Sequence, residues 1–157
     1  MEQIVNHVKL LEESWKELQE WAANCSFDPE TEADIQCFLY HCLVKRLGTA
    51  TSIHAESPHK EGISDLVIDN KVFVELNYIL RSGERTEGSW KARTKNAKEE
   101  IEKLGELKKE CSTITGVLAV FSKTYNEDDE CWYDEIKKLC EKSGIIMLRP
   151  WKRKTER

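Results

Sequence analysis

Two acidic residues stand inside apolar, strand-like runs of the stretch GISDLVIDNKVFVELN, residues 62–77. Asp65 and Glu75 each have aliphatic neighbours, and Asn77 follows Glu75 by two residues. Burying an ionised carboxylate without a partner costs at least several kcal/mol. We therefore expect a cation beside the two acids, or a proton on one of them.

The length of the loop between the two runs decides whether the acids meet. A two-residue loop would place Asp65 and Glu75 on opposite faces of the hairpin. A three-residue loop pairs Ile68 with Val72 and sets the acids directly opposite each other; Asn70 tolerates the left-handed backbone that such loops need. Only this register separates an apolar face from a face that carries both acids and the following asparagine. The sequence therefore predicts the three-residue loop.

Like charges directly opposite each other destabilise a sheet. A divalent metal ion would relieve the repulsion, since hard cations take carboxylate oxygens as ligands. We expect Mg²⁺ or Mn²⁺ between Asp65 and Glu75. The alternative is a salt bridge from either acid to a basic residue such as Lys91 or Arg93.

A third acid lies on the same helix face as residues expected in the core. Glu32 repeats with Ile35, Leu39 and Cys42 at intervals of three and four, so it points with the apolar face of a helix. That helix is expected to begin at Asp28 and Pro29 and to end before Gly48. An earlier helix has helical apolar spacing from Ile4 to Ala22.

The remaining elements follow from apolar runs and turn residues. Strands are expected near residues 52–56, 63–68 and 72–80, at 114–121, which is apolar throughout as in a central strand, and at 145–148. Helices are expected over about 89–111, with Ala97, Ile101, Leu104 and Cys111 inward, and over about 127–143. The order α-α-β-β-β-α-β-α-β predicts an α/β fold in three layers, a mixed sheet flanked by helices.

The length of 157 residues fits a single domain. Within residues 1–157 we expect an accessory N-terminal helix over 1–24, a core over 28–149 and a basic tail over 150–157. The N-terminus lacks the apolar run of a signal peptide, and no segment has membrane-span length, so a soluble cytoplasmic protein with no membrane partner is expected.

The acids and their surroundings resemble the PD-(D/E)XK nuclease superfamily, which has the restriction-endonuclease-like fold. The resemblance covers roughly residues 30–149 in element order, and its specific part is Ser64-Asp65-Leu66-Val67-Ile68 followed by Val74-Glu75-Leu76-Asn77. It implies that Asp65 and Glu75 are metal ligands, that the Leu76 carbonyl joins them, and that Glu32 acts through a metal-bound water. Ser64 stands where the family motif names proline.

The resemblance fails at one functional position. Asn77 stands where the family usually has a lysine, and a neutral amide supplies no positive charge to the reaction. Lys91, Lys95 and Lys98 lie along one flank of the next helix, so Lys95 or Lys98 could supply the charge from there. The alternative is that these lysines contact phosphates or solvent.

The net charge of −5 is unevenly distributed along the chain. Residues 1–34 are strongly acidic, whereas residues 81–98 and the tail from Arg149 are each basic. Such segments can hold a polyanion, although charge alone favours ordinary solvated surface. The residues expected to contact a nucleic-acid backbone are Arg81, Arg85, Lys91, Arg93, Lys95, Lys152, Arg153 and Lys154.

Six cysteines without a signal peptide indicate reduced structural thiols. Cys37, His41 and Cys42 could form half of a zinc site, but no second ligand pair has suitable spacing. Trp15, Trp21 and the first helix could form a homodimer contact or could belong to the core.

The resemblance implies a magnesium-dependent phosphodiester hydrolase, an endo- or exodeoxyribonuclease that cuts nucleic acid, with DNA as the expected substrate. A second hypothesis is a nuclease-like module that binds nucleic acid or a protein without cleaving. A third is a small α/β adaptor protein whose acids form salt bridges.

Overall fold

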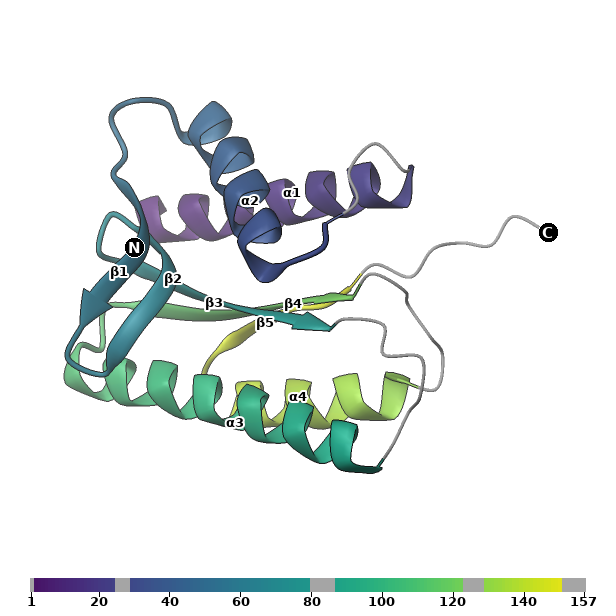
Figure 1. The fold of residues 1–157 in the computed structure, drawn as a ribbon. Helices are drawn as coiled ribbons and strands as arrows, with labels where there is room; N and C mark the ends of the chain where they lie inside the picture. Colours follow the sequence, from purple (N-terminus) through teal and green to yellow (C-terminus); the bar gives the residue numbers. More distant parts are fainter. Residues whose placement is uncertain (1, 25–28, 80–86, 123–128, 151–157) are drawn as a thin grey trace.

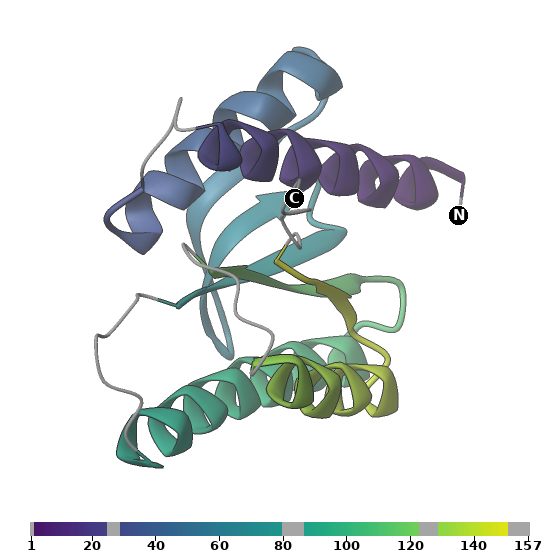
Figure 2. The same cartoon turned by 90° about the vertical axis from the view of Figure 1, so that its right-hand side faces the viewer.

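The structure, a computed structural model, describes residues 2–24, 29–79, 87–122 and 129–150. A five-stranded mixed sheet lies between two pairs of helices, with α1 and α2 on one face and α3 and α4 on the other (Figures 1 and 2). The element order α-α-β-β-β-α-β-α-β confirms the predicted order and the α/β class.

The sheet has the strand order β1-β2-β3-β4-β5, the same as the order along the chain. The first three strands form an antiparallel meander, whereas β4 and β5 join as parallel neighbours. The central strand β4 is buried along six consecutive residues, as its continuous apolar sequence predicts. The strands are β1 (Ile53–His59), β2 (Gly62–Ile68), β3 (Val72–Ile79), β4 (Thr115–Ser122) and β5 (Ile146–Leu148).

The hairpin between β2 and β3 has the predicted three-residue loop. Ile68 pairs with Val72, and Asp69 and Asn70 both have left-handed backbone conformations, with φ of 50° and 51°. The predicted apolar face of the hairpin packs against α1 and α2; it consists of Leu66, Ile68, Val72, Val74 and Leu76. This register fixes which face Glu75 and Asn77 share, because side chains alternate along a strand.

Helix α1 (Glu2–Ala23) packs its apolar stripe on the sheet, and Leu11, Trp15 and Leu18 belong to the same buried cluster as β2 and β3. The Trp15 indole donates a hydrogen bond to the carbonyl oxygen of Arg149. Of the two alternatives for this residue, a homodimer contact or the core, the structure therefore favours the core. Trp21 remains 46 % exposed and packs against Phe38 of α2.

Helix α2 (Glu32–Leu47) begins later than the sequence analysis predicted. Thr31 is the N-cap: its hydroxyl accepts a hydrogen bond from Asp34 N, and the Asp34 side chain accepts one from Thr31 N, a capping box. Pro29 precedes the helix, and Asp28 lies outside the described residues. Gly48 ends the helix as predicted, with φ of 70°.

Helix α3 (Glu87–Glu110) and helix α4 (Glu130–Lys142) lie side by side on the opposite face (Figures 1 and 2). Ala97, Ile101 and Leu104 are buried as predicted, but Cys111 lies just beyond α3 and is exposed, so its predicted inward position is wrong. In the described part of the chain, no helix combines the length and apolar character that a membrane span needs.

Candidate functional site

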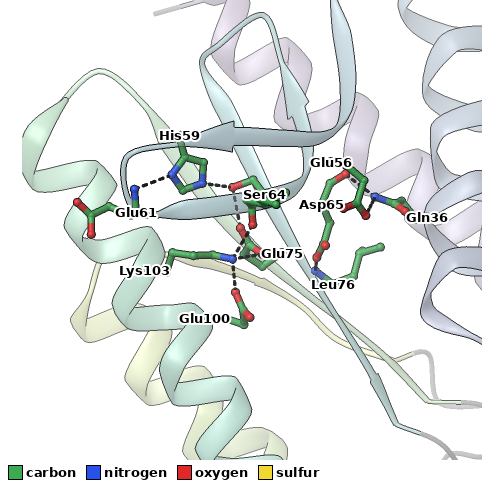
Figure 3. Close-up of polar contacts among 11 residues, drawn as sticks. Gln36, Glu56, His59, Glu61, Ser64, Asp65, Glu75, Leu76, Glu100 and Lys103 are labelled. Atoms are coloured by element: carbon green, nitrogen blue, oxygen red, sulfur yellow. Dashed lines mark hydrogen bonds and ion pairs between the residues drawn. The ribbon is translucent and has the colours of Figure 1, made fainter.

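The site lies where β2 separates from β3. The described pairing between these strands stops at Leu66–Val74, while β2 stays paired with β1 as far as Gly62–His59. Beyond this point the side chain of Asp65 takes over a backbone role, because its Oδ2 accepts the N–H of Leu76 at 2.6 Å. Side chains fill the resulting opening between the strands (Figure 3).

Glu75 is the most deeply buried acid of this opening, with 1 % of its surface exposed. Its two carboxylate oxygens have different partners. Ser64 Oγ donates to Oε1 at 2.7 Å, and the ammonium group of Lys103 donates to Oε2 at 2.7 Å. Lys103 belongs to α3, so the helix layer supplies the cation that this strand lacks.

Lys103 joins several oxygen atoms in the same place. Its Nζ lies 2.8 Å from Oε2 of Glu100, one turn earlier on α3, and donates to the carbonyl oxygen of Ile63 at 2.9 Å. Two carboxylates therefore share one ammonium group (Figure 3). The cluster carries a net negative charge unless a carboxyl group takes up a proton.

Burial raises the pKa of Glu75 to about 8, although the hydrogen bonds from Lys103 and Ser64 oppose the shift and the nearby Glu100 adds to it. Burial by itself would lower the pKa of Lys103, but its bonds to Glu100 and Glu75 outweigh that effect and raise this pKa. Lys103 is therefore charged at neutral pH, and Glu75 readily retains a proton.

A chain of hydrogen bonds leads from Glu75 to the hairpin between β1 and β2. His59 Nδ1 accepts the N–H of Glu61 at 3.2 Å, and its Nε2 lies 2.9 Å from Ser64 Oγ. Burial, followed by the charge of Lys103, lowers the pKa of His59, which favours the neutral ring. With Nδ1 accepting, the proton is on Nε2, which donates to Ser64, and Ser64 in turn donates to Glu75.

Asp65 lies on the other side of the opening, close to α2. Gln36 donates to the Asp65 carbonyl oxygen at 2.7 Å and to Glu56 Oε1 at 3.2 Å, so this amide ties α2 to β1 and β2. Burial raises the pKa of Asp65; the bond from Leu76 N opposes the shift and the charge of Glu100 adds to it.

Glu32 also reaches the sheet, as its position on the helix face predicted. The residue is exposed overall, yet its Oε2 accepts the N–H of Tyr78 at 3.3 Å. Desolvation raises the pKa of Glu32, and the charge of Asp65 raises it further. Three acids from α2, β2 and β3 thus have raised pKa values for related reasons, burial and repulsion by a neighbouring acid.

The lysines expected at Glu75 lie elsewhere. Lys95 pairs with Glu99 on the outer surface of α3, and Lys98 pairs with Glu135 of α4. The lysine that reaches Glu75 is Lys103, one to two turns further along the helix. Asn77 is half-buried on the face of β3 that also carries Glu75, and its side chain forms no hydrogen bond with the described residues.

The expected nucleic-acid contacts are only partly described. Lys91 is exposed and Arg93 half-buried near the start of α3, and both have interaction partners. Arg149 does not extend into a tail but forms ion pairs with Glu130 and Asp134 of α4. Five of the predicted residues lie outside the described part of the chain: Arg81, Arg85, Lys152, Arg153 and Lys154.

The donor set has the right chemistry for a hard divalent ion. Carboxylates from Asp65, Glu75 and Glu32 and the carbonyl oxygen of Leu76 are the ligands that Mg²⁺ prefers. Among the described residues, however, no three acidic, histidine or cysteine side chains are close enough together to bind a metal. Metal binding would therefore require Glu75 to exchange its bond with Lys103 for a metal ligand bond.

Sequence reasoning missed four residues of this cluster: Lys103, Glu100, Ser64 as a hydrogen-bond partner, and His59. One usable signal existed. Glu100 and Lys103 each directly precede a buried residue of α3, Ile101 and Leu104, so they border the buried stripe. The salt bridge considered as an alternative to metal is present, but Lys103 forms it rather than Lys91 or Arg93.

Comparisons of the chain with protein-family models, with curated proteins and with solved structures give no match.

Proposed function

We propose that the protein is a magnesium-dependent phosphodiester hydrolase that cuts nucleic acid, with DNA as the expected substrate. One observation carries the proposal: Lys103 Nζ lies 2.7 Å from Glu75 in an opening that also contains Asp65. A glutamate and a lysine thus meet on one side of the opening and an aspartate lies on its other side, although the lysine comes from α3 rather than from β3.

In this proposal Asp65 and Glu75 hold the ion, with the Leu76 carbonyl as a further ligand and Glu32 acting through water. The bound ion would activate water and stabilise charge on the phosphate. Lys103 would orient the attacking water and offset the negative charge that develops in the transition state. Ser64 and His59 would position the carboxyl group of Glu75.

The fold supports the proposal through the resemblance to the restriction-endonuclease-like fold. The antiparallel meander β1–β3, a helix, a parallel strand, a second helix and a final strand follow the element order of the restriction-endonuclease-like core. Fold alone does not determine function, so the argument depends on the site.

A second function is favoured by the way Glu75 is bonded. Both of its oxygens already have partners inside the protein, and Lys103 supplies a positive charge without any metal. A module that kept this fold while binding nucleic acid or a protein, without cleavage, would need nothing further at the site.

A cleavage assay with Mn²⁺ or Mg²⁺ separates the two functions. Wild-type protein would be tested on single-stranded, duplex and branched DNA and RNA, beside Asp65→Asn and Lys103→Met. The matched control is Asp134→Asn, an exposed aspartate that pairs with Arg149 far from the site. Metal-dependent cleavage by wild type and by the control is the expected result, with cleavage lost in Asp65→Asn and reduced about 10²-fold in Lys103→Met.

Two results would contradict the enzyme proposal. Wild-type protein that cuts none of these substrates would leave the binding module as the better description. Cleavage that persists in Asp65→Asn would indicate a contaminating nuclease or a different active centre.

A further inference from the structure

A groove of about 520 Å³ runs between α3 and α4, on the helix layer below the sheet. Its floor is apolar where Ile101 and Leu139 meet, and Gly105 lies at the middle of its α3 side. Lysines and glutamates of α3 and Lys142 of α4 form its rim. The groove lies on the opposite flank of α3 from Lys103, so it is separate from the site described above.

Among the described residues, nothing packs against the open side of Gly105. This residue lies in the interior of α3, where glycine weakens a helix relative to alanine. A Cβ atom added there would meet nothing within 4 Å, so the packing leaves room for a larger residue. Glycine on an open helix surface allows another backbone to approach closely.

The charges along α3 are complementary to those of a second, antiparallel copy of the same helix. Glu102 lies three residues before Gly105, and Lys108 and Lys109 lie three and four residues after it. An antiparallel copy of α3 that crosses at Gly105 would therefore place Glu102 opposite Lys108 and Lys109. Each contact would occur twice, because a two-fold axis repeats every pair.

The groove side chains are available for such contacts. Glu102 is exposed and forms no ion pair or hydrogen bond with the described residues. The Lys109 side chain is 75 % exposed, and among the described residues it pairs only with Glu106 of its own helix, at 2.6 Å. Lys108, by contrast, donates to the Gly144 carbonyl oxygen, which makes Lys109 the better group to vary.

We propose that the groove between α3 and α4 is a homodimer interface, in which α3 of a second copy crosses antiparallel at Gly105. The occupant is a second copy because Gly105 lies between Glu102 and the two lysines, a charge pattern that the same helix complements when it is reversed. Helix α3 has 24 residues and is about 36 Å long, enough to extend across a two-fold contact. The aliphatic stem of Lys109 would cover Ile101 of the second copy.

Sedimentation equilibrium of the purified chain tests the interface by mass, independently of any cleavage activity. Wild type should dimerise at protein concentrations up to about 0.1 mM, within the range of weak specific complexes. Glu102→Lys and Lys109→Glu should each weaken the dimer by about tenfold or more, since each brings like charges together twice. The double variant E102K/K109E should restore it.

Matched controls lie on the same helix outside the groove. Glu99→Lys and Lys95→Glu repeat the two charge changes at an exposed i,i+4 pair, and Lys95 is as exposed as Lys109. Both should leave the dimer unchanged. Gly105→Gln should abolish the dimer while the melting temperature stays level or rises, because glutamine favours a helix more than glycine does.

Three results would overturn the proposal. The first is a wild-type protein that stays monomeric throughout this concentration range. The second is a dimer that the groove variants leave intact, or that E102K/K109E fails to restore. The third is a loss of nucleic-acid or peptide binding in the groove variants without any change in mass, which would assign the groove to another partner.

Discussion

The ammonium group of Lys103 binds the buried carboxylate of Glu75 although 28 residues separate them in the sequence. The contact joins the helix layer to the strand at the point where β2 and β3 separate. The contact compensates the charge of a carboxylate that lies among aliphatic residues. The side chain of Lys103 is itself only 18 % exposed. The stability of the pair should therefore depend strongly on which member is charged.

Lys103→Met should destabilise the protein in a pH-dependent way. Removing one member of a buried ion pair costs about 3–5 kcal/mol when the other stays charged. At pH 6 Glu75 can take a proton instead, so the loss should be small there and should approach that range at pH 9. Urea unfolding at the two pH values measures the difference.

Lys95→Met is the control for this variant. Lys95 also contacts a glutamate, Glu99, at 3.6 Å, but on the surface, where such pairs contribute about 0–1 kcal/mol. A further double variant, Lys103→Met with Glu75→Gln, should recover most of the stability at pH 9. Equal losses for Lys103→Met at both pH values would show that Glu75 does not titrate in response to its partner.

Glu75→Gln should remove the part of the pH dependence of wild-type stability that comes from this carboxyl group. The folded pKa of about 8 lies above the reference value of 4.5, so the folded chain holds this proton more tightly than the unfolded chain. Stability from this group is therefore full below pH 4.5 and falls as pH rises towards 8, by up to about 1.4 kcal/mol per pH unit. Glutamine cannot titrate and removes that slope.

The measurement is chemical unfolding in EDTA at pH 5, 7 and 9, for wild type and Glu75→Gln. The free energy of unfolding of the variant, relative to wild type, should increase with pH. Glu99→Gln on the outer surface of α3 provides the control. A constant difference across this range would contradict the raised pKa.

Asp65→Asn and Asp65→Ala should have different effects on stability. The amide oxygen of asparagine can still accept the N–H of Leu76, and it removes a charge that the surroundings disfavour, so Asp65→Asn should be as stable as wild type or more so. Alanine leaves that N–H without its acceptor and should cost about 1–2 kcal/mol. Thermal melts in EDTA separate the two.

Wild type and Asp65→Asn together test metal binding. A ligand of the folded state at a hundred times its Kd stabilises by about 2.7 kcal/mol, so Mn²⁺ should raise the melting temperature of wild type. It should leave Asp65→Asn unchanged, because one of two carboxylate ligands is gone. An equal increase in both proteins would place the ion elsewhere.

The hairpin register could be predicted from the sequence because two independent signals agreed. Strand alternation sorted the faces in one register only, and Asn70 suited the left-handed turn that this register requires. The start of α2 shows the opposite case. Asp28-Pro29 and Thr31 with Asp34 are both acceptable helix starts, and the sequence alone does not decide between them.

The identity of the lysine at Glu75 could not be predicted for a geometric reason. The buried stripe of α3 was correctly identified, but a helix that lies on a sheet has two flanks. Here the flank with Glu100 and Lys103 faces β2 and β3, whereas the flank with Lys98 faces α4. To tell which flank faces the strands, one must know on which side of α3 the helix α4 lies. The apolar periodicity of the sequence does not give this information.

Asn77→Lys tests whether the position of the positive charge matters for the proposed activity. Asn77 shares a face of β3 with Glu75, so a lysine there would point towards the same opening. Because Lys103 already supplies a cation, Asn77→Lys alone should change the cleavage rate by less than about tenfold. Lys103→Met should reduce it by about 10²-fold, since one well-placed charge contributes a few kcal/mol to the transition state.

The decisive protein is the double variant, Asn77→Lys with Lys103→Met. If the reaction needs one positive charge near Glu75, the new lysine should recover at least a tenth of the wild-type rate. Asn77→Gln with Lys103→Met is the control, since glutamine is long and polar but uncharged, and it should recover nothing. Recovery by both would point to restored packing instead of charge. Recovery by neither, in proteins shown to be folded, would mean that Lys103 acts through its bonds to Glu100 and Ile63, which a lysine on β3 does not reproduce.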